Sequence, residues 1–218
     1  MTSTVSSIGS SQEEKRLLAV ALDYSVLDHL QRIQAGTYTG VRAASLSRIR
    51  AAGESRRVEV WIAEITPVEM LHGIEKIAAD DAKRTQAVAR DKTKEAIAMA
   101  MGAKTLAYPC SKLDDTYSRL GMSFRLGGPD SHLADALERR LLSIKGVSAG
   151  DARQLVSCAF PTDGTKVDFH PRLDCFVAED IELVRALRNE VAAGNLPELG
   201  HLSIGTADEI VAAHASHF

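Results

Sequence analysis

The stretch LAVALDYSVLDHL, residues 18–30, carries the pattern that decides the fold. A short apolar run from Leu17 to Leu22 ends at Asp23, and apolar residues then recur at helical spacing at Val26 and Leu30. Short apolar runs bounded by polar residues are typical of buried strands, and the later spacing is typical of helices. The stretch therefore predicts a strand that leads directly into a helix, with an aspartate at the junction.

The same alternation continues through the chain. Further strands are expected at Val58–Ile65, Lys104–Tyr108, Leu173–Ala178 and Leu202–Gly205. Further helices are expected at Val41–Ala52 with Gly53 as a C-terminal cap, from Thr66 onward, and at Asp80–Met101, Lys112–Leu120, Ser131–Ser143, Ser148–Phe160, Asp180–Ala193 and Thr206–Ala215. Strands separated by helices of this length imply right-handed crossovers and a mainly parallel sheet covered on both faces.

Composition predicts one soluble domain over residues 16–218. The 218 residues are 45% hydrophobic and 25% charged, which is ordinary for a globular chain. Residues 1–15 are polar and rich in Ser and Thr, so we expect a disordered tail. No run approaches the roughly 20 apolar residues of a membrane-spanning helix. Cys110, Cys158 and Cys175 lack CxxC spacing, which favours reduced thiols in a cytoplasmic protein.

Three more stretches place an acid where an apolar stretch gives way to a helix. They are WIAEITPVEMLHGI at residues 61–74, GVSAGDARQLVSCA at 146–159 and DCFVAEDIELV at 174–184, with the acids Glu69, Asp151 and Asp180. Together with Asp23, these acids would gather at the carboxyl edge of a parallel sheet, where ligands bind. Carboxylates within ~4 Å repel by about 1 kcal/mol per pair in water and about 4 at a dielectric of 20. Mg²⁺ or Mn²⁺ would relieve that repulsion and supply an activated water for phosphodiester hydrolysis.

Helix capping is the structural alternative for each acid taken singly. Hydroxyl-x-x-acid boxes occur at Thr66 with Glu69, Ser148 with Asp151 and Thr206 with Glu209. Asp180 fits an N-terminal cap, and we assign no chemistry to the last box. Only the set of four acids favours a metal site.

The order of these motifs resembles the PIN-domain family from Leu17 to about Ala213. The matching segments are Asp23-Tyr24-Ser25, Thr66 with Glu69, Asp151-Ala152, Phe176-Val177-Ala178-Glu179-Asp180 and the closing segment from His201 to Ile210. The resemblance implies a three-layer α/β sandwich with a five-stranded sheet of order 3-2-1-4-5. It also implies an endoribonuclease that cleaves single-stranded RNA.

The resemblance assigns roles to individual residues. Asp23, Asp151 and Asp180 would coordinate Mg²⁺ or Mn²⁺ directly, and Glu69 would bind it directly or through water. The residues expected to support these acids are Ser25, Thr66 and Glu179, with Asp28 and Asp174 as auxiliary acids. Ala178 stands where the family often has Thr or Ser, so a hydroxyl is missing there. If the chain is a toxin of a toxin–antitoxin pair, a small antitoxin would be its partner, and a homodimer is compatible with the sequence.

The formal net charge of −3 gives no overall attraction to nucleic acid, so RNA would have to be held by a local basic patch or through bound cations. The candidates are Arg42, Arg48, Arg50, Arg56 and Arg57, with Arg125 in the glycine-containing middle segment. A solvated helix face explains the same arginines equally well.

Two other functions remain open from the sequence. One is a catalytically idle PIN-like interaction module whose acids only cap helices. The other is a metal-dependent phosphoesterase that acts on DNA or on small phosphate esters.

Overall fold

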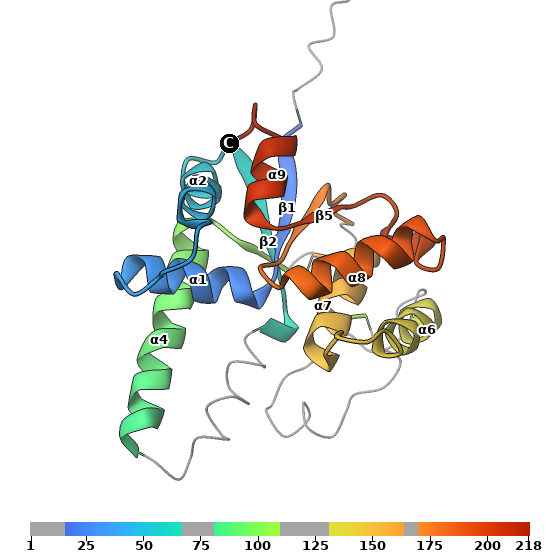
Figure 1. Cartoon of the computed structure of the whole chain (residues 1–218), viewed down its shortest axis with the longest axis horizontal. Helices are drawn as coiled ribbons and strands as arrows, with labels where there is room; N and C mark the ends of the chain where they lie inside the picture. The colour runs from blue at the N-terminus through green and yellow to red at the C-terminus, as the bar shows by residue number, and fades with distance from the viewer. Residues whose placement is uncertain (1–15, 67–80, 110–130, 164–169) are drawn as a thin grey trace, which may run out of the picture.

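The computed structural model describes residues 16–66, 81–109, 131–163 and 170–218, and Figure 1 shows their arrangement. Five parallel strands form one sheet in the order β3-β2-β1-β4-β5. The strands are β1 (Leu18–Leu22), β2 (Val58–Ala63), β3 (Lys104–Leu106), β4 (Cys175–Val177) and β5 (Ser203–Gly205). The predicted fold class and strand order are therefore confirmed.

Helices connect the strands as the sequence pattern predicts. The described helices are α1 (Tyr24–Gln34), α2 (Ala43–Glu54), α4 (Asp81–Ala100), α6 (Ser131–Leu142), α7 (Ala149–Ala159), α8 (Ile181–Ala192) and α9 (Ala207–Ala213), with a 3₁₀ turn η1 (Pro197–Leu199). Their bounds lie within a few residues of the predicted ones. None of these described helices is long and apolar enough to cross a membrane.

Two hydrophobic clusters fill the spaces on either side of the sheet. Along β1, Ala19 and Ala21 face the cluster beneath α6, α7 and α8, whereas Val20 and Leu22 face the one beneath α1, α2, α4 and α9. Figure 1 shows the two groups of helices on opposite sides of the strands. Because β1 is buried along its whole length, it reads as a continuous apolar run. The result is the expected three-layer sandwich.

Gly53 has a different role from the predicted one. It lies inside α2, which continues to Glu54, and it is buried. A Cβ atom at this position would lie 3.0 Å from side-chain atoms of both Met101 and Val60. The prediction that Gly53 caps the helix is therefore wrong, because its missing side chain serves close packing of α2 on the sheet.

Several predictions fall outside the described residues. They concern the tail 1–15, Glu69, Cys110, the helix at 112–120 and Arg125. The helix expected to open at Thr66 is visible only at its start, where Ile65 and Thr66 are already helical.

Candidate active site

The strand order creates a switch point between β1 and β4. The chain runs from β1 outward through β2 to β3, and then returns to the other side of β1 for β4 and β5. In open α/β sheets, ligands bind outside the carboxyl ends of the strands at such a point. Asp23 directly follows β1, and Asp180 follows β4 after two intervening residues. Two of the predicted acids therefore flank the position where this fold places its ligand.

Asp23 is buried and held in place by Ser25. Its backbone N–H donates to the carbonyl of Val177 at 2.9 Å, which joins the ends of β1 and β4. Its Oδ2 accepts hydrogen bonds from the Ser25 backbone N–H at 3.1 Å and from the Ser25 hydroxyl. The same hydroxyl accepts from the backbone N–H of Glu179 at 3.1 Å. Ser25 thus fixes the orientation of Asp23 relative to the end of β4.

α7 brings Asp151 close enough to interact with Asp23. Burial raises the pKa of Asp23, the hydrogen bond from Ser25 opposes that rise, and the charge of Asp151 adds to it. On the same helix, burial raises the pKa of the Cys158 thiol, and the charge of Asp23 contributes. Asp23 and Asp151 are 128 positions apart in the sequence. Their carboxylates nevertheless influence each other's ionisation in the folded protein.

Asp151 and Asp180 each cap the start of a helix. Asp151 Oδ2 accepts from the backbone N–H of Ser148 at 2.8 Å, and the Ser148 hydroxyl accepts from the Asp151 N–H at 3.1 Å. Asp180 Oδ1 accepts from the N–H groups of Glu182 at 2.9 Å and Leu183 at 3.1 Å. The capping roles recognised in the sequence are therefore present at both positions.

Capping leaves part of each carboxylate unused. Among the described residues, Oδ1 of Asp151 and Oδ2 of Asp180 receive no hydrogen bond, and both bonds from Ser25 reach Oδ2 of Asp23, not Oδ1. No salt bridge from the described part of the chain neutralises any of these three acids. One oxygen of each acid therefore holds a helix start, and the other is available to a cation.

The donor set fits a hydrated ion better than a closed cage. Within residues 16–66, 81–109, 131–163 and 170–218, no three His, Cys, Asp or Glu side chains stand close enough to hold a metal ion. Mg²⁺ typically keeps several waters and is bound through one or two carboxylates together with substrate phosphates. The pair Asp23 and Asp151, with Asp180 beyond the end of β4, suits that mode. Glu69 lies outside the described residues.

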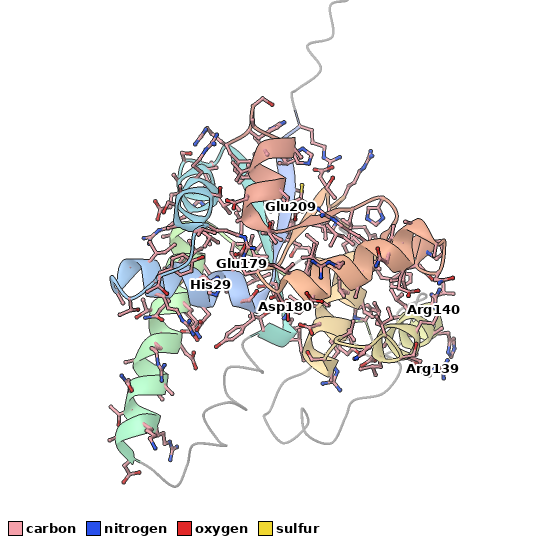
Figure 2. The ribbon with its side chains drawn as sticks, viewed as in Figure 1. His29, Arg139, Arg140, Glu179, Asp180 and Glu209 are labelled. Carbon is pink, nitrogen blue, oxygen red and sulfur yellow. The ribbon has the colours of Figure 1, made fainter. Side chains whose placement is uncertain are left out.

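Glu179 is already bound to other groups. Its side chain has 0% exposure, and its Oε2 accepts from Arg42 Nη1 at 3.0 Å. Its Oε1 accepts from the Ala207 N–H at 2.9 Å. Figure 2 shows Glu179 between His29 on α1 and Asp180 at the start of α8. The two carboxylate oxygens of Glu179 therefore bind an arginine and the start of α9.

The predicted basic patch does not form one surface at the site. Arg42 reaches the carboxyl edge, whereas Arg56 and Arg57 immediately precede β2 and therefore lie at the opposite edge. Arg57 donates to the carbonyl of Phe218 at 3.1 Å, and Arg50 pairs with Glu54 at 2.7 Å. Arg48 is exposed on α2.

The auxiliary acids contact other groups. Asp28 pairs with Arg32 at 2.8 Å and with Lys94 at 3.1 Å. Asp174 precedes β4, at the amino edge of the sheet, and pairs with Arg16 at 2.8 Å. Thr66, predicted to support the acids, is fully buried in the helical turn that follows β2, and its hydroxyl has no hydrogen-bond partner in the described structure.

Lys94 on α4 is a buried cation that the sequence did not reveal. Only 3% of it is exposed, and its Nζ contacts the Tyr24 hydroxyl, Asp28 and, at 3.3 Å, Asp91. Nζ also lies 4.3 Å from the centre of the Tyr24 ring. Burial lowers the pKa of Lys94, but the Tyr24 hydroxyl and Asp28 outweigh it, so the pKa is raised. Lys94 thereby anchors the residue that follows Asp23.

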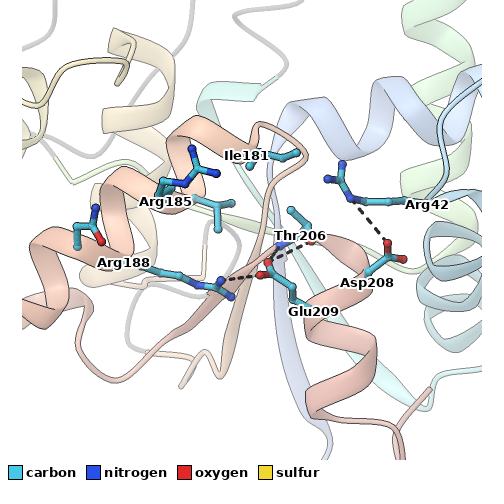
Figure 3. Close-up of a pocket in the computed structure, with 9 residues that line it drawn as sticks. Arg42, Ile181, Arg185, Arg188, Thr206, Asp208 and Glu209 are labelled. Atoms are coloured by element: carbon cyan, nitrogen blue, oxygen red, sulfur yellow. Dashed lines mark hydrogen bonds and ion pairs between the residues drawn. The ribbon is translucent and has the colours of Figure 1, made fainter.

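A pocket of about 410 Å³ lies between α8 and the start of α9, and Figure 3 shows the residues that line it. Its lining residues are Arg42, Ile181, Val184, Arg185, Arg188, Asn189, Thr206, Asp208 and Glu209. Arg42 also binds Glu179, and Ile181 directly follows Asp180, so the pocket adjoins the acidic edge. Arg185 and Arg188 were missed in the sequence, although they stand three residues apart on the helix that Asp180 begins.

Comparisons with known proteins place these features in context. No protein-family model, curated protein or solved structure matches the chain. The strand order and the acids at the switch point are therefore the basis for a proposal of function.

Proposed function

We propose that the chain is a PIN-type, metal-dependent endoribonuclease that hydrolyses phosphodiester bonds of single-stranded RNA with Mg²⁺ or Mn²⁺. The observation that carries the proposal is the environment of the Asp23 carboxylate. It is a buried carboxylate at the switch point, with no salt bridge in the described structure and with Asp151 opposing its ionisation. A divalent cation at this point would offset both penalties.

The acids would bind the cation, and Ser25 would position one of them. Asp23 and Asp151 would hold the cation through their unused oxygens, Asp180 would approach it from the end of β4, and Glu69 remains a predicted further ligand. Ser25 keeps Asp23 in one orientation, since it is bonded to both Asp23 and the Glu179 backbone. When bound, the ion would lower the pKa of a coordinated water and neutralise charge on the scissile phosphate.

Two further features support the RNA substrate. The acids lie at the carboxyl edge of the sheet, and the adjoining pocket is lined by three arginines, so an extended phosphate chain would have cationic groups next to the carboxylates. The net charge of −3 offers no general attraction, which favours such local contacts. As expected for a nuclease of this kind, we place the protein in the cytoplasm; if it is a toxin, a small antitoxin would bind it.

An idle interaction module is the second candidate. The observation that favours it is that three of the predicted acids each accept backbone hydrogen bonds at a helix start. In such a module the acids would only cap helices. The folded state would bind divalent metal no more tightly than the unfolded state, so added metal would not stabilise the protein.

Cleavage assays separate these possibilities. We expect purified protein to cut end-labelled single-stranded RNA with Mg²⁺ or Mn²⁺ but not with EDTA, and to leave single-stranded DNA and small phosphate esters uncut. Asp23→Asn should reduce the rate by more than about 100-fold, since even residues behind metal ligands cost 10–100-fold. Asp174→Asn, at the opposite end of β4, is the matched control and should retain activity. Equal cleavage by Asp23→Asn, or no cleavage by wild type with either metal, would overturn the nuclease proposal.

A further inference from the structure

We propose that the pocket between α8 and α9 binds one nucleotide of the substrate strand, with its phosphate held by Arg185 together with Arg42 and Arg188. This inference rests on the proposed nuclease function and adds a substrate subsite to it. In Figure 3, Arg185 and Arg188 stand on the α8 side of the pocket, and Arg42 reaches it from the opposite side. A phosphate between them would meet cations from two directions.

Arg42 and Arg188 are held firmly and still keep donor groups. Arg188 donates from Nε to the carbonyl of Ile204 at 2.7 Å and from Nη1 to Glu209 at 2.6 Å. Arg42 donates from Nη1 to Glu179 and has Nε 3.8 Å from Asp208. In the described ranges, the Nη2 group of neither arginine has a hydrogen-bond partner. Since each guanidinium is fixed through Nε and Nη1, its Nη2 group is held in place and remains as a donor for a phosphate.

Arg185 is the most available cation. It pairs with Glu182 at 2.7 Å, but the two side chains are 63% and 77% exposed. Exposed ion pairs contribute little, so Arg185 can exchange Glu182 for a phosphate at small cost. Of the two acids in the lining, Glu209 is bound by Arg188 and by Thr206, and Asp208 is half-exposed. The lining therefore carries three arginines against two acids, and these acids pair with Arg42 and Arg188 rather than with Arg185.

The rest of the pocket suits a ribose and base. Ile181 is 47% exposed and Val184 lies beneath it on α8, so the wall offers apolar surface beside the arginines. A volume of about 410 Å³ falls in the range of about 300–1,000 Å³ typical of small-molecule sites, enough for one nucleotide. None of the nine lining residues is aromatic. We therefore expect weak base selectivity, because stacking platforms are what bind bases most strongly.

The position of the pocket relates it to the acids. Asp180 and Ile181 are consecutive, so the acidic edge and the pocket meet at the start of α8. An extended strand crossing the acids would therefore place a neighbouring nucleotide in the pocket. A base-paired strand keeps its bases stacked in the duplex, which favours single-stranded RNA at this subsite.

Nucleotide titration tests the subsite without any metal. Uridine 5′-monophosphate, uridine and inorganic phosphate are each titrated into the full chain in EDTA, with calorimetry as the readout. We expect the nucleotide to bind most tightly and Arg185→Ala to weaken it roughly tenfold, the value of one charged hydrogen bond. Arg139→Ala is the control, since Arg139 is an exposed arginine on α6, away from the pocket in Figure 2. Equal nucleotide affinity in wild type and Arg185→Ala, or uridine binding as tightly as its monophosphate, would overturn the subsite.

A second measurement keeps the two proposals apart. RNA binding is measured over a range of salt concentrations with the Asp23→Asn variant, which should not cleave the RNA. Adding Arg185→Ala to this variant should lessen the slope of log affinity against log salt by about 0.7. If the protein cleaves RNA but Arg185→Ala does not change nucleotide binding, the subsite proposal is wrong and the nuclease proposal stands. If Arg185→Ala weakens nucleotide binding but the protein shows no metal-dependent cleavage, the nuclease proposal is wrong and the pocket remains a nucleotide site.

Discussion

Arg42 donates a hydrogen bond of 3.0 Å to the buried carboxylate of Glu179, 137 residues further along the chain. Arg42 comes from the connection between α1 and α2, and Glu179 comes from the end of β4. The second oxygen of Glu179 accepts from Ala207 at the start of α9. One carboxylate therefore ties three segments together beside the switch point and places an arginine between the acids and the pocket.

Arg42→Met should destabilise the fold, because it leaves the Glu179 carboxylate buried without its cation. Breaking a buried pair in this way costs about 3 kcal/mol of unfolding free energy. Urea denaturation measures the change. Arg185→Ala is the matched control, since it breaks an exposed pair and should change stability by no more than about 0.5 kcal/mol. Similar stability of the two variants would show that Glu179 does not depend on Arg42.

Lys94→Met should also destabilise the fold by about 3 kcal/mol, because Asp28 and Asp91 would lose a buried cation. Lys92→Met on the same helix removes an exposed lysine and should have an effect below about 0.5 kcal/mol. Chemical denaturation of both variants gives the comparison. An equally small effect at both positions would mean that the buried contacts of Lys94 contribute nothing net.

Asp23→Asn should stabilise the metal-free protein near neutral pH. The pKa of Asp23 in the folded state is raised above its ordinary value of 3.8, chiefly by burial. The folded state therefore binds this proton more tightly than the unfolded state. The stability that results from this tighter proton binding is fully present below pH 3.8 and is lost as the pH rises through the raised pKa of Asp23. Removing the charge should raise the unfolding free energy most at high pH.

The measurement is urea denaturation of wild type and Asp23→Asn in EDTA over a pH series. The gain in the variant should shrink as pH falls toward the ordinary aspartate value. Glu95→Gln, an exposed acid on α4, is the control and should track wild type throughout. A variant that is less stable than wild type by the same amount at every pH would contradict the raised pKa.

The fold was predictable because its local signals agree. The unbroken apolar run of β1 predicted a strand buried on both faces, and the Ser148 and Asp180 caps marked helix starts that the structure confirms. The strand order followed from the resemblance to PIN domains, not from composition, and it is confirmed.

The partners of individual charges were not predictable. The pairing of Arg42 with Glu179 depends on tertiary contact, which neither residue's neighbours in sequence reveal. A lysine in a helix of mixed charges is ordinarily exposed, so nothing local indicated that Lys94 is buried. Gly53 was predicted to end α2 because glycine often does so, whereas its actual reason lies in Met101 and Val60 across the interface.

Manganese binding tests the central claim most directly, because it asks whether the carboxylates at the switch point hold a cation. Mn²⁺ is titrated by calorimetry into wild type, Asp23→Asn, Asp151→Asn and Asp174→Asn, and unfolding is followed with and without the ion. We predict saturable binding in wild type and Asp174→Asn, a stability gain of about 2.7 kcal/mol at 100 times Kd, and at least roughly tenfold weaker binding in the other two variants. No binding to wild type, or equal binding by all four proteins, would contradict the account.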